Sequence, residues 1–280
     1  EAQLTHRQLI AVLSARGEVV VDALGAALEL HLFALHHARV ALMAAVLPPG
    51  RRIVDLGGAN APLYESGYPY EFDELIMVDL PPADRHEEFA GRIHESKHTP
   101  QGKVAMLYTD MADLSAIEDA SVDLVWSGES IEHISRDHAR AVYDEVRRIL
   151  RPDGAFCLDT PNALVTRIHS PDALIHPDHK IEYTPAELVA DLHAGGFDVT
   201  RSYGVCEMPL TVAAGHIDYR DFLVGAGLSA ELDRCYIQYH ECRLHGAHSR
   251  SVPPAAHGAD PHRPLARARG TLNRLRRRLK

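Results

Sequence analysis

The clearest indication of the fold of this 280-residue chain is the segment Ile53-Val54-Asp55-Leu56-Gly57-Gly58-Ala59-Asn60. Its first half is a short apolar run of the kind that forms a buried strand. The two glycines that follow allow a tight turn and a close approach of the backbone to a ligand. Because open α/β sheets bind ligands at the carboxyl ends of their strands, we expect a binding site at this turn.

The same alternation of apolar runs and turns continues along the chain. Further strands are predicted over residues 75–79, 104–108, 122–126, 155–158, 197–203 and 236–243. Helices are predicted over residues 137–150 and 185–194, and a turn over 151–154. Continuous apolar strands that alternate with helices form parallel sheets buried on both faces. The predicted fold class is therefore α/β: a Rossmann-like, seven-stranded, mainly parallel sheet with helices on both faces.

Composition divides the chain into three parts. Residues 1–47 are predicted to form an N-terminal helical cap that covers the core, closes a homodimer interface or caps the active site. Residues 48–244 form the main domain, in which 205–230 is interpreted as an acceptor-site insertion. Residues 245–280 are predicted to be a flexible basic tail, which is either solvated or a basic amphipathic helix in peripheral contact with an anionic membrane.

Charge and cysteine content narrow the class of protein. Eight basic and no acidic residues lie between Arg263 and Lys280, which leaves 21 basic against 39 acidic residues in the rest of the chain. A body this acidic argues against broad binding to a nucleic-acid backbone. The four cysteines show no Cys-x-x-Cys spacing, and neither a signal-peptide pattern nor a bilayer-spanning apolar stretch is present. We expect reduced thiols and a cytoplasmic protein.

Polar residues follow successive strands at the edge where the glycine turn lies. Asp79 ends the second predicted strand and can accept hydrogen bonds from ribose hydroxyls. Asp110 and Met111 follow the third, where a carboxylate and a backbone N–H can bracket an adenine, and Ser127 follows the fourth. The pattern Gly-x-Gly-x-x-Gly is absent, which counts against a dinucleotide-dependent reductase.

This series of strand ends resembles the class I S-adenosylmethionine-dependent methyltransferases, whose first motif is acidic-x-Gly-x-Gly. Asp55 and Gly57 match that motif, and Ala59 stands in place of its second glycine. The resemblance spans about residues 50–245 and implies S-adenosylmethionine as the cofactor. It assigns the methionine part to Asp55, Gly57, Gly58 and Asn60, the ribose to Asp79, and the adenine to Asp110 and Met111.

A second cluster follows the fourth predicted strand, in Glu129-Ser-Ile-Glu132-His133. If this segment opens a helix, its two carboxylates and its imidazole share one helix face. His179 on a later loop can complete a divalent metal site. Carboxylates suit Mg²⁺ and Mn²⁺, whereas imidazoles shift the preference toward Mn²⁺, Co²⁺ or Zn²⁺, and we expect Mg²⁺ or Mn²⁺. In the alternative without a metal, His133 is a general base or a packing residue, and His176 is a further candidate ligand or base.

Together with Thr160-Pro161-Asn162 and residues 179–184, this cluster resembles metal-dependent O-methyltransferases, notably the Hen family of small-RNA 3′-terminal 2′-O-methyltransferases. That resemblance implies Glu129, Glu132, His133 and His179 as the metal ligands. Residues 78–82 and 178–184 also resemble actinobacterial methyltransferases that modify mannose-containing polysaccharides.

The leading hypothesis is a divalent-metal-assisted O-methyltransferase that acts on a sugar hydroxyl of a glycan, an oligosaccharide or a glycosylated metabolite. A cation chelated by two adjacent oxygens selects a vicinal diol, which sugars provide. One alternative is methylation of the terminal ribose of RNA, which the acidic body disfavours. The other is a non-catalytic scaffold on a methyltransferase fold, which the change to Ala59 motivates.

Overall fold

The computed structural model describes residues 39, 42–59, 61–85, 95–218, 220–221 and 228–247. Contacts divide the chain into residues 1–248 and 249–280, and every described residue belongs to the first unit. Asn60, most of the predicted helical cap and the basic tail after residue 247 lie outside the described residues.

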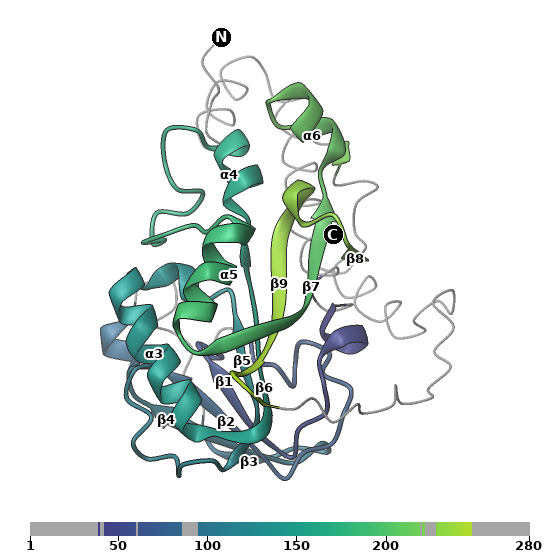
Figure 1. Ribbon diagram of the computed structural model, residues 1–280. Helices are drawn as coiled ribbons and strands as arrows, with labels where there is room; N and C mark the ends of the chain where they lie inside the picture. The colour runs from purple at the N-terminus through teal and green to yellow at the C-terminus, as the bar shows by residue number, and fades with distance from the viewer. Residues whose placement is uncertain are drawn as a thin grey trace, which may run out of the picture. The chain divides into compact units, whose positions relative to one another are not determined.

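A nine-stranded mixed sheet forms the centre of the described chain, in the order β3-β4-β2-β1-β5-β6-β9-β7-β8 (Figure 1). The strands are β1 (Arg52–Leu56), β2 (Glu74–Asp79), β3 (Lys97–His98), β4 (Lys103–Tyr108), β5 (Val122–Gly128), β6 (Leu150–Pro161), β7 (Phe197–Glu207), β8 (Leu228–Ser229) and β9 (Cys235–Leu244). Five of them, β4, β2, β1, β5 and β6, pair in parallel. β9 runs antiparallel to both β6 and β7.

The prediction of a seven-stranded, mainly parallel sheet was therefore wrong in its count and in its description of pairing. All seven predicted strands are present, but β3 and β8 add two residues each at the edges. Such short strands carry no period-2 signal. Half of the eight strand pairings are antiparallel, which is a property of how strands meet and not of any strand's own sequence.

Two predicted helices are present with nearly the predicted bounds, α3 (Arg136–Ile149) and α5 (Pro185–Ala194). The Ser135 side chain caps α3, and Thr184 and Glu187 form a capping box at the start of α5. The local sequence therefore specifies where both helices begin. The remaining described helices are short: α4 (Ala163–His169), α6 (Pro209–Ala214) and the 3₁₀ turns η1 (Pro82–Asp84), η2 (Ile131–His133) and η3 (Leu232–Arg234).

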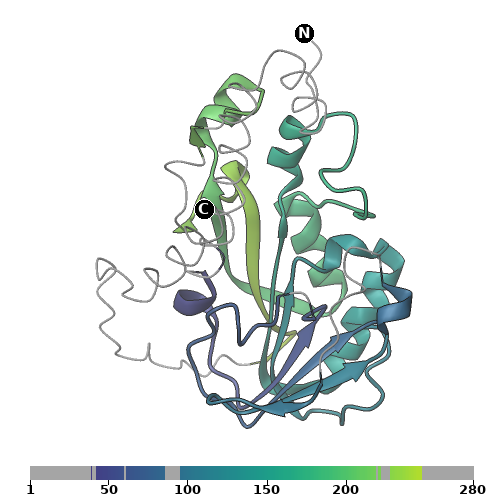
Figure 2. The same cartoon turned by 180° about the vertical axis from the view of Figure 1, so that it is seen from behind.

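Alternate strand residues supply two hydrophobic cores, one on each face of the sheet. Val54 packs in the core beneath α3 and α5, whereas its neighbour Ile53 packs in the opposite core. The opposite face is covered by the helical residues 42–46 and by the loop 61–72, so helix and loop share that face (Figure 2). Of the predicted cap, the described residues Leu42, Met43 and Leu47 are buried in this core.

The expected alternation of strand and helix holds only in part. The described residues of the connections 57–73 and 109–121 form turns without a helix. The predicted turn 151–154 falls inside β6, where Leu150 pairs with Val122 and Ala155 pairs with Leu124. The four intervening residues therefore bulge against one residue of β5, so the chain turns there without leaving the strand.

The predicted insertion 205–230 begins as a continuation of β7 through Glu207, which is followed by α6. All four cysteines are free thiols and are buried. Within the described residues, no helix has both the length and the apolarity that crossing a membrane requires.

Candidate functional site

A cavity of about 1200 Å³ opens at the carboxyl ends of β1, β2, β4, β5 and β6. It is lined by both groups of residues that the sequence singles out: Asp55, Gly57, Gly58, Asp79, Asp110 and Met111 of the nucleotide group, and Glu129, Glu132, His133, His176 and His179 of the metal group. Ser127 is buried within β5 and is not part of this lining. The fold thus joins two sequence motifs in one space, which neither motif indicates by itself.

The glycine turn after β1 is held by contacts within the protein. Gly57 has a φ of +73°, and a side chain there would meet Ser130 at 2.8 Å. A side chain at Gly58 would lie 2.4 Å from a carboxylate oxygen of Asp55. The glycines are therefore required by the packing of the turn as well as by its nearness to a ligand.

Asp55 is a buried carboxylate that fixes the far side of the same loop. It accepts a hydrogen bond from the backbone N–H of Leu63 at 2.8 Å. Burial raises the pKa of Asp55 to about 7, and the neighbouring charge of Asp79 adds to the rise, although the bond from Leu63 opposes it. Asp55 consequently titrates near neutral pH.

Asp79, at the end of β2, faces the cavity beside a cationic partner. Its carboxylate accepts hydrogen bonds from the backbone of Ala59 at 3.1 Å and of Leu80 at 2.8 Å. Arg85 forms an ion pair with it at 3.2 Å. These contacts fix the Asp79 carboxylate at the strand end, where the sequence predicted a ribose contact.

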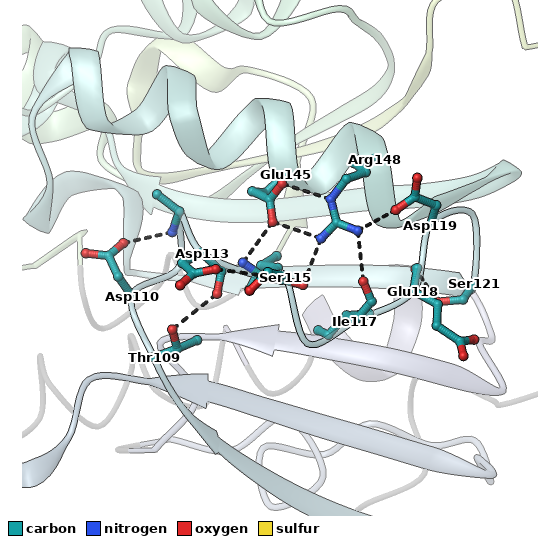
Figure 3. Close-up of polar contacts among 12 residues, drawn as sticks. Thr109, Asp110, Asp113, Ser115, Ile117, Glu118, Asp119, Ser121, Glu145 and Arg148 are labelled. Atoms are coloured by element: carbon teal, nitrogen blue, oxygen red, sulfur yellow. Dashed lines mark hydrogen bonds and ion pairs between the residues drawn. The ribbon is translucent and has the colours of Figure 1, made fainter.

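Asp110 stands on the loop after β4, and α3 holds that loop in place. Asp110 accepts from the N–H of Ala112 at 2.8 Å and contacts Nε2 of His138 at 2.7 Å. Farther along the loop, Arg148 of α3 donates to the carbonyls of Leu114 and Ile117, each at 2.8 Å (Figure 3). The helix thus anchors the segment that presents Asp110 to the cavity.

The metal group is built differently from the prediction. Glu129 has a φ of +47°, and the chain then forms the single 3₁₀ turn η2, so the three residues do not share an α-helical face. The Glu129 N–H donates to the backbone and to the side chain of Asp159, each at 3.0 Å, and its carboxylate lies 3.4 Å from Arg39. Long-range contacts that the local sequence does not show thus replace the predicted helix.

Glu132, His133 and His179 nevertheless come together. Each offers one ligand atom, and these three atoms lie within 4.8 Å of one another. Glu129 is not in this group. The backbone brings the two segments together, because the carbonyl of Glu132 accepts from the N–H of Lys180 at 2.7 Å and of Ile181 at 3.2 Å.

Buried partners orient the side chains of this cluster. Glu182 accepts from Nδ1 of His179 at 2.8 Å, and Thr160 donates to Glu132 at 2.9 Å. Burial would raise the pKa of Glu182, but the hydrogen bonds from His179, Thr166 and Ile175 outweigh it and lower that pKa. An ionised Glu182 keeps the proton of His179 on Nδ1, which leaves the Nε2 lone pair for a ligand.

Burial and neighbouring groups shift the pKa values of two members of the cluster in opposite directions. Burial, together with the charge of Glu129, raises the pKa of Glu132 well above its usual range. Burial and the neighbouring His179 and His176 lower the pKa of His133 to about 4, so its imidazole is neutral at physiological pH. Nδ1 of His176 accepts from the N–H of Asp178 at 3.2 Å, which places the proton of a neutral His176 on Nε2.

Arg39 and Asp159 were missed by the sequence analysis. Asp159 is fully buried at the end of β6 and receives two hydrogen bonds from the Arg39 guanidinium, at 2.8 and 2.9 Å. Burial disfavours the charge of Arg39, but Asp159 and Glu129 raise its pKa above the usual value. Glu182 belongs to the motif at residues 178–184, but the sequence analysis assigned it no role. No local pattern indicated Arg39.

Comparisons with known proteins point to one class of domain. Residues 69–158 match the family described as "Methyltransferase domain". A 103-residue segment is 38% identical to a probable S-adenosylmethionine-dependent methyltransferase of Mycolicibacterium smegmatis, and covers 37% of this chain and 38% of that protein. The chain thus matches little more than a third of the length of that curated relative.

Solved structures share the fold. A SAM-dependent methyltransferase from Thermotoga maritima superimposes with a TM-score of 0.54 at 14% identity, over 80% of this chain and 96% of that one. A methyltransferase of Haloferax volcanii, solved in complex with the activator Trm112, gives a TM-score of 0.51 at 18% identity, over 77% and 91% of the two chains. At these identities the likeness is one of fold.

Proposed function

We propose that the protein is a class I S-adenosylmethionine-dependent methyltransferase that transfers the methyl group of this cofactor to a hydroxyl group with the help of a divalent cation; the match of residues 69–158 to a methyltransferase domain supports the coarser part of the proposal. The observation that carries the proposal is the shared cavity. The nucleotide-type residues Asp55, Asp79 and Asp110 and the cluster of Glu132, His133 and His179 line the same space of about 1200 Å³.

The size of the cavity and the chemistry of its nucleotide end support S-adenosylmethionine as the cofactor. The cavity is larger than an ordinary small-molecule pocket of roughly 300–1,000 Å³, which leaves room for an acceptor beside the cofactor. Asp79 and Asp110 provide carboxylate acceptors at two neighbouring strand ends, suited to ribose hydroxyls and to the adenine amino group. Methionine would lie along the glycine turn, beside Asp55.

The other end fits a divalent cation. Glu132, His133 and His179 supply one oxygen and two nitrogen donors, a set that suits Mn²⁺, Co²⁺ or Zn²⁺ better than Mg²⁺. Three protein ligands leave coordination positions open, as catalytic sites require. When bound, the cation supplies Lewis-acid polarisation of an acceptor hydroxyl.

The chain's own residues position the acceptor. An acceptor with two adjacent hydroxyls can fill two open positions of such a site, and sugars provide these vicinal diols. Nε2–H of His176 can donate to an acceptor oxygen, so His176 is assigned to orientation and not to proton removal. A fixed acceptor beside a fixed methyl donor contributes much of the rate of such a transfer.

A sugar of a glycan, an oligosaccharide or a glycosylated metabolite is the acceptor class that the composition favours. Outside its last 18 residues the chain carries 39 acidic against 21 basic residues, which repels a polyanionic acceptor such as RNA. A neutral sugar meets no such repulsion.

The test is transfer of a labelled methyl group from S-adenosylmethionine to mannose-type oligosaccharides and to short RNA, with and without a chelator. We expect transfer to the sugars that stops with the chelator and returns with Mn²⁺. His179→Ala should lose turnover while still binding the cofactor, whereas His216→Ala, an exposed histidine on the chain after α6, should behave as the unaltered protein.

The other outcomes are equally informative. Transfer to RNA alone would replace the sugar by a terminal ribose as the acceptor. Methyl transfer that continues in the presence of the chelator would exclude the cation from the mechanism. His133 would then be the residue that accepts the proton. Failure of the protein to bind S-adenosylmethionine would refute the proposed methyltransferase activity and would favour a non-catalytic scaffold.

A further inference from the structure

A second group of metal-type side chains lies on the opposite edge of the sheet. His193 is in the last turn of α5, Asp198 is the second residue of β7, and His245 follows β9. β9 runs antiparallel to β6, so its end lies beside the start of β6 and away from the cavity, which opens at the end of β6 (Figure 1). These three residues take no part in the site described above.

The ligand atoms of this group converge closely. Nε2 of His245 lies 3.2 Å from Nδ1 of His193 and 3.5 Å from a carboxylate oxygen of Asp198. The third side of the triangle, from Nδ1 of His193 to the same oxygen, is 3.8 Å. Two ligands on tetrahedral zinc, each bonded at about 2.0–2.1 Å, stand about 3.4 Å apart. The triangle therefore already has the size of one face of a tetrahedral site.

The backbone holds the three residues in this arrangement. Gly196 donates to the carbonyl of His193 at 3.0 Å, and the N–H of His245 donates to the carbonyl of Gly196 at 3.1 Å. Asp198 is paired with Arg243 in the β7–β9 ladder. Because the chain positions are fixed by these bonds, a bound ion would have to order only the three side chains.

Because these three side chains are exposed, an ion can bind here with little loss of hydration free energy. The side chains of His193, Asp198 and His245 are 70%, 53% and 41% exposed, so an ion need shed little water beyond the positions that the ligands fill. Two imidazoles and one carboxylate form a donor set of the zinc type and not of the magnesium or calcium type.

We propose that His193, Asp198 and His245 form a binding site for a divalent transition-metal ion of the zinc class, which joins the end of β9 to the turn between α5 and β7. The fourth coordination position is open to water. The site is independent of the cavity cluster and of the catalytic function proposed for it.

The experiment uses the full chain, freed of any histidine tag and of metal, with Zn²⁺ as the probe. Calorimetric titration is compared among the unaltered protein, His245→Ala, His193→Ala, and the matched control His216→Ala. We expect zinc affinity to fall on the order of tenfold or more when either cluster histidine is removed, and to stay unchanged in the control. His179→Ala, which alters only the cavity cluster, should keep this zinc site.

A second readout locates the ion. Zinc should slow amide hydrogen exchange in peptides that cover residues 193–198 and 243–247, and this protection should vanish in His245→Ala. Equal zinc affinity in the unaltered protein and in both cluster variants, or protection confined to the cavity segments, would overturn the proposal and leave only a hydrogen-bonded histidine pair. Loss of methyl transfer in His179→Ala with zinc protection retained at this edge would separate the two sites.

Discussion

Replacement of Glu182 gives the sharpest test of how the cavity cluster is held. Its carboxylate accepts three hydrogen bonds, from Nδ1 of His179 at 2.8 Å, from the N–H of Ile175 at 2.7 Å and from the hydroxyl of Thr166 at 2.5 Å. The side chain is almost fully buried, at 2% exposed. Glu182 thereby sets which nitrogen of His179 faces the cavity, without lining the cavity itself.

Two substitutions separate the charge from the geometry. In Glu182→Gln, the amide oxygen can still accept from Ile175 and His179, and the hydroxyl of Thr166 can rotate to accept from the amide nitrogen. The variant loses only the charge-assisted part of these bonds, about 1–2 kcal/mol of folding free energy. Glu182→Ala leaves three buried donors without this acceptor, which at about 1–3 kcal/mol each amounts to a loss of roughly 3–6 kcal/mol once water refills part of the space.

Metal affinity should follow the same order. Residues that orient a histidine ligand typically contribute about 10–100-fold to metal binding. We therefore expect Mn²⁺ affinity to fall about tenfold in Glu182→Gln and about 100-fold in Glu182→Ala, measured by calorimetry under conditions where urea unfolding shows each variant to be folded. Glu187→Gln, a substitution of the same type in the exposed capping box of α5, should leave Mn²⁺ affinity unchanged. Unaltered affinity in a folded Glu182→Ala would refute the role of Glu182 in orienting His179 as a ligand.

Three further predictions concern the nucleotide end. The raised pKa of Asp55, about 7 against about 3.9 in an unfolded chain, means that its own contribution to stability is fully present below about pH 4 and is lost as pH rises through 7, by up to about 4 kcal/mol. Asp55→Asn keeps the acceptor for Leu63 and should remove this fall; equal pH dependence of urea unfolding in both proteins would refute the assignment. Asp79→Ala should weaken S-adenosylmethionine binding about tenfold or more in a calorimetric titration through lost ribose hydrogen bonds, and unchanged affinity would place the ribose elsewhere. Arg148→Lys keeps the charge but not the forked contacts to the loop and to Glu145, so it should lower the free energy of unfolding by about 2 kcal/mol and weaken cofactor binding. An unchanged free energy of unfolding in Arg148→Lys would mean that other contacts hold the loop.

The elements that could be predicted are those with a local signal. Each of the seven longer strands carries a local pattern of apolar residues, and α3 and α5 carry capping residues and an apolar face. The strand-end carboxylates could be placed at one edge because parallel strands end together. The succession of strands and turns along the chain was therefore enough to predict where Asp79, Asp110 and the glycine turn lie.

The elements that could not be predicted depend on distant partners. Glu129 adopts a left-handed backbone because its N–H meets Asp159, 30 residues away, and Asp159 in turn pairs with Arg39, 120 residues away. The spacing of Glu129, Glu132 and His133, which predicted a helix, gives no indication of these long-range contacts. Glu132, His133 and His179, three of the four predicted ligands, come close together, but the helical face that grouped Glu129, Glu132 and His133 in the prediction is absent.

The longer strands, the two longer helices and the polar residues at the strand ends can be derived from the amino-acid sequence alone. They follow from short-range patterns of burial, capping and turn formation. Three features depend on the folded chain: both motifs share one cavity, Glu182 accepts from Nδ1 of His179, and His193, Asp198 and His245 meet at the far edge of the sheet. The reason is that side-chain distances across a sheet depend on strand order and direction, which no local stretch of sequence specifies.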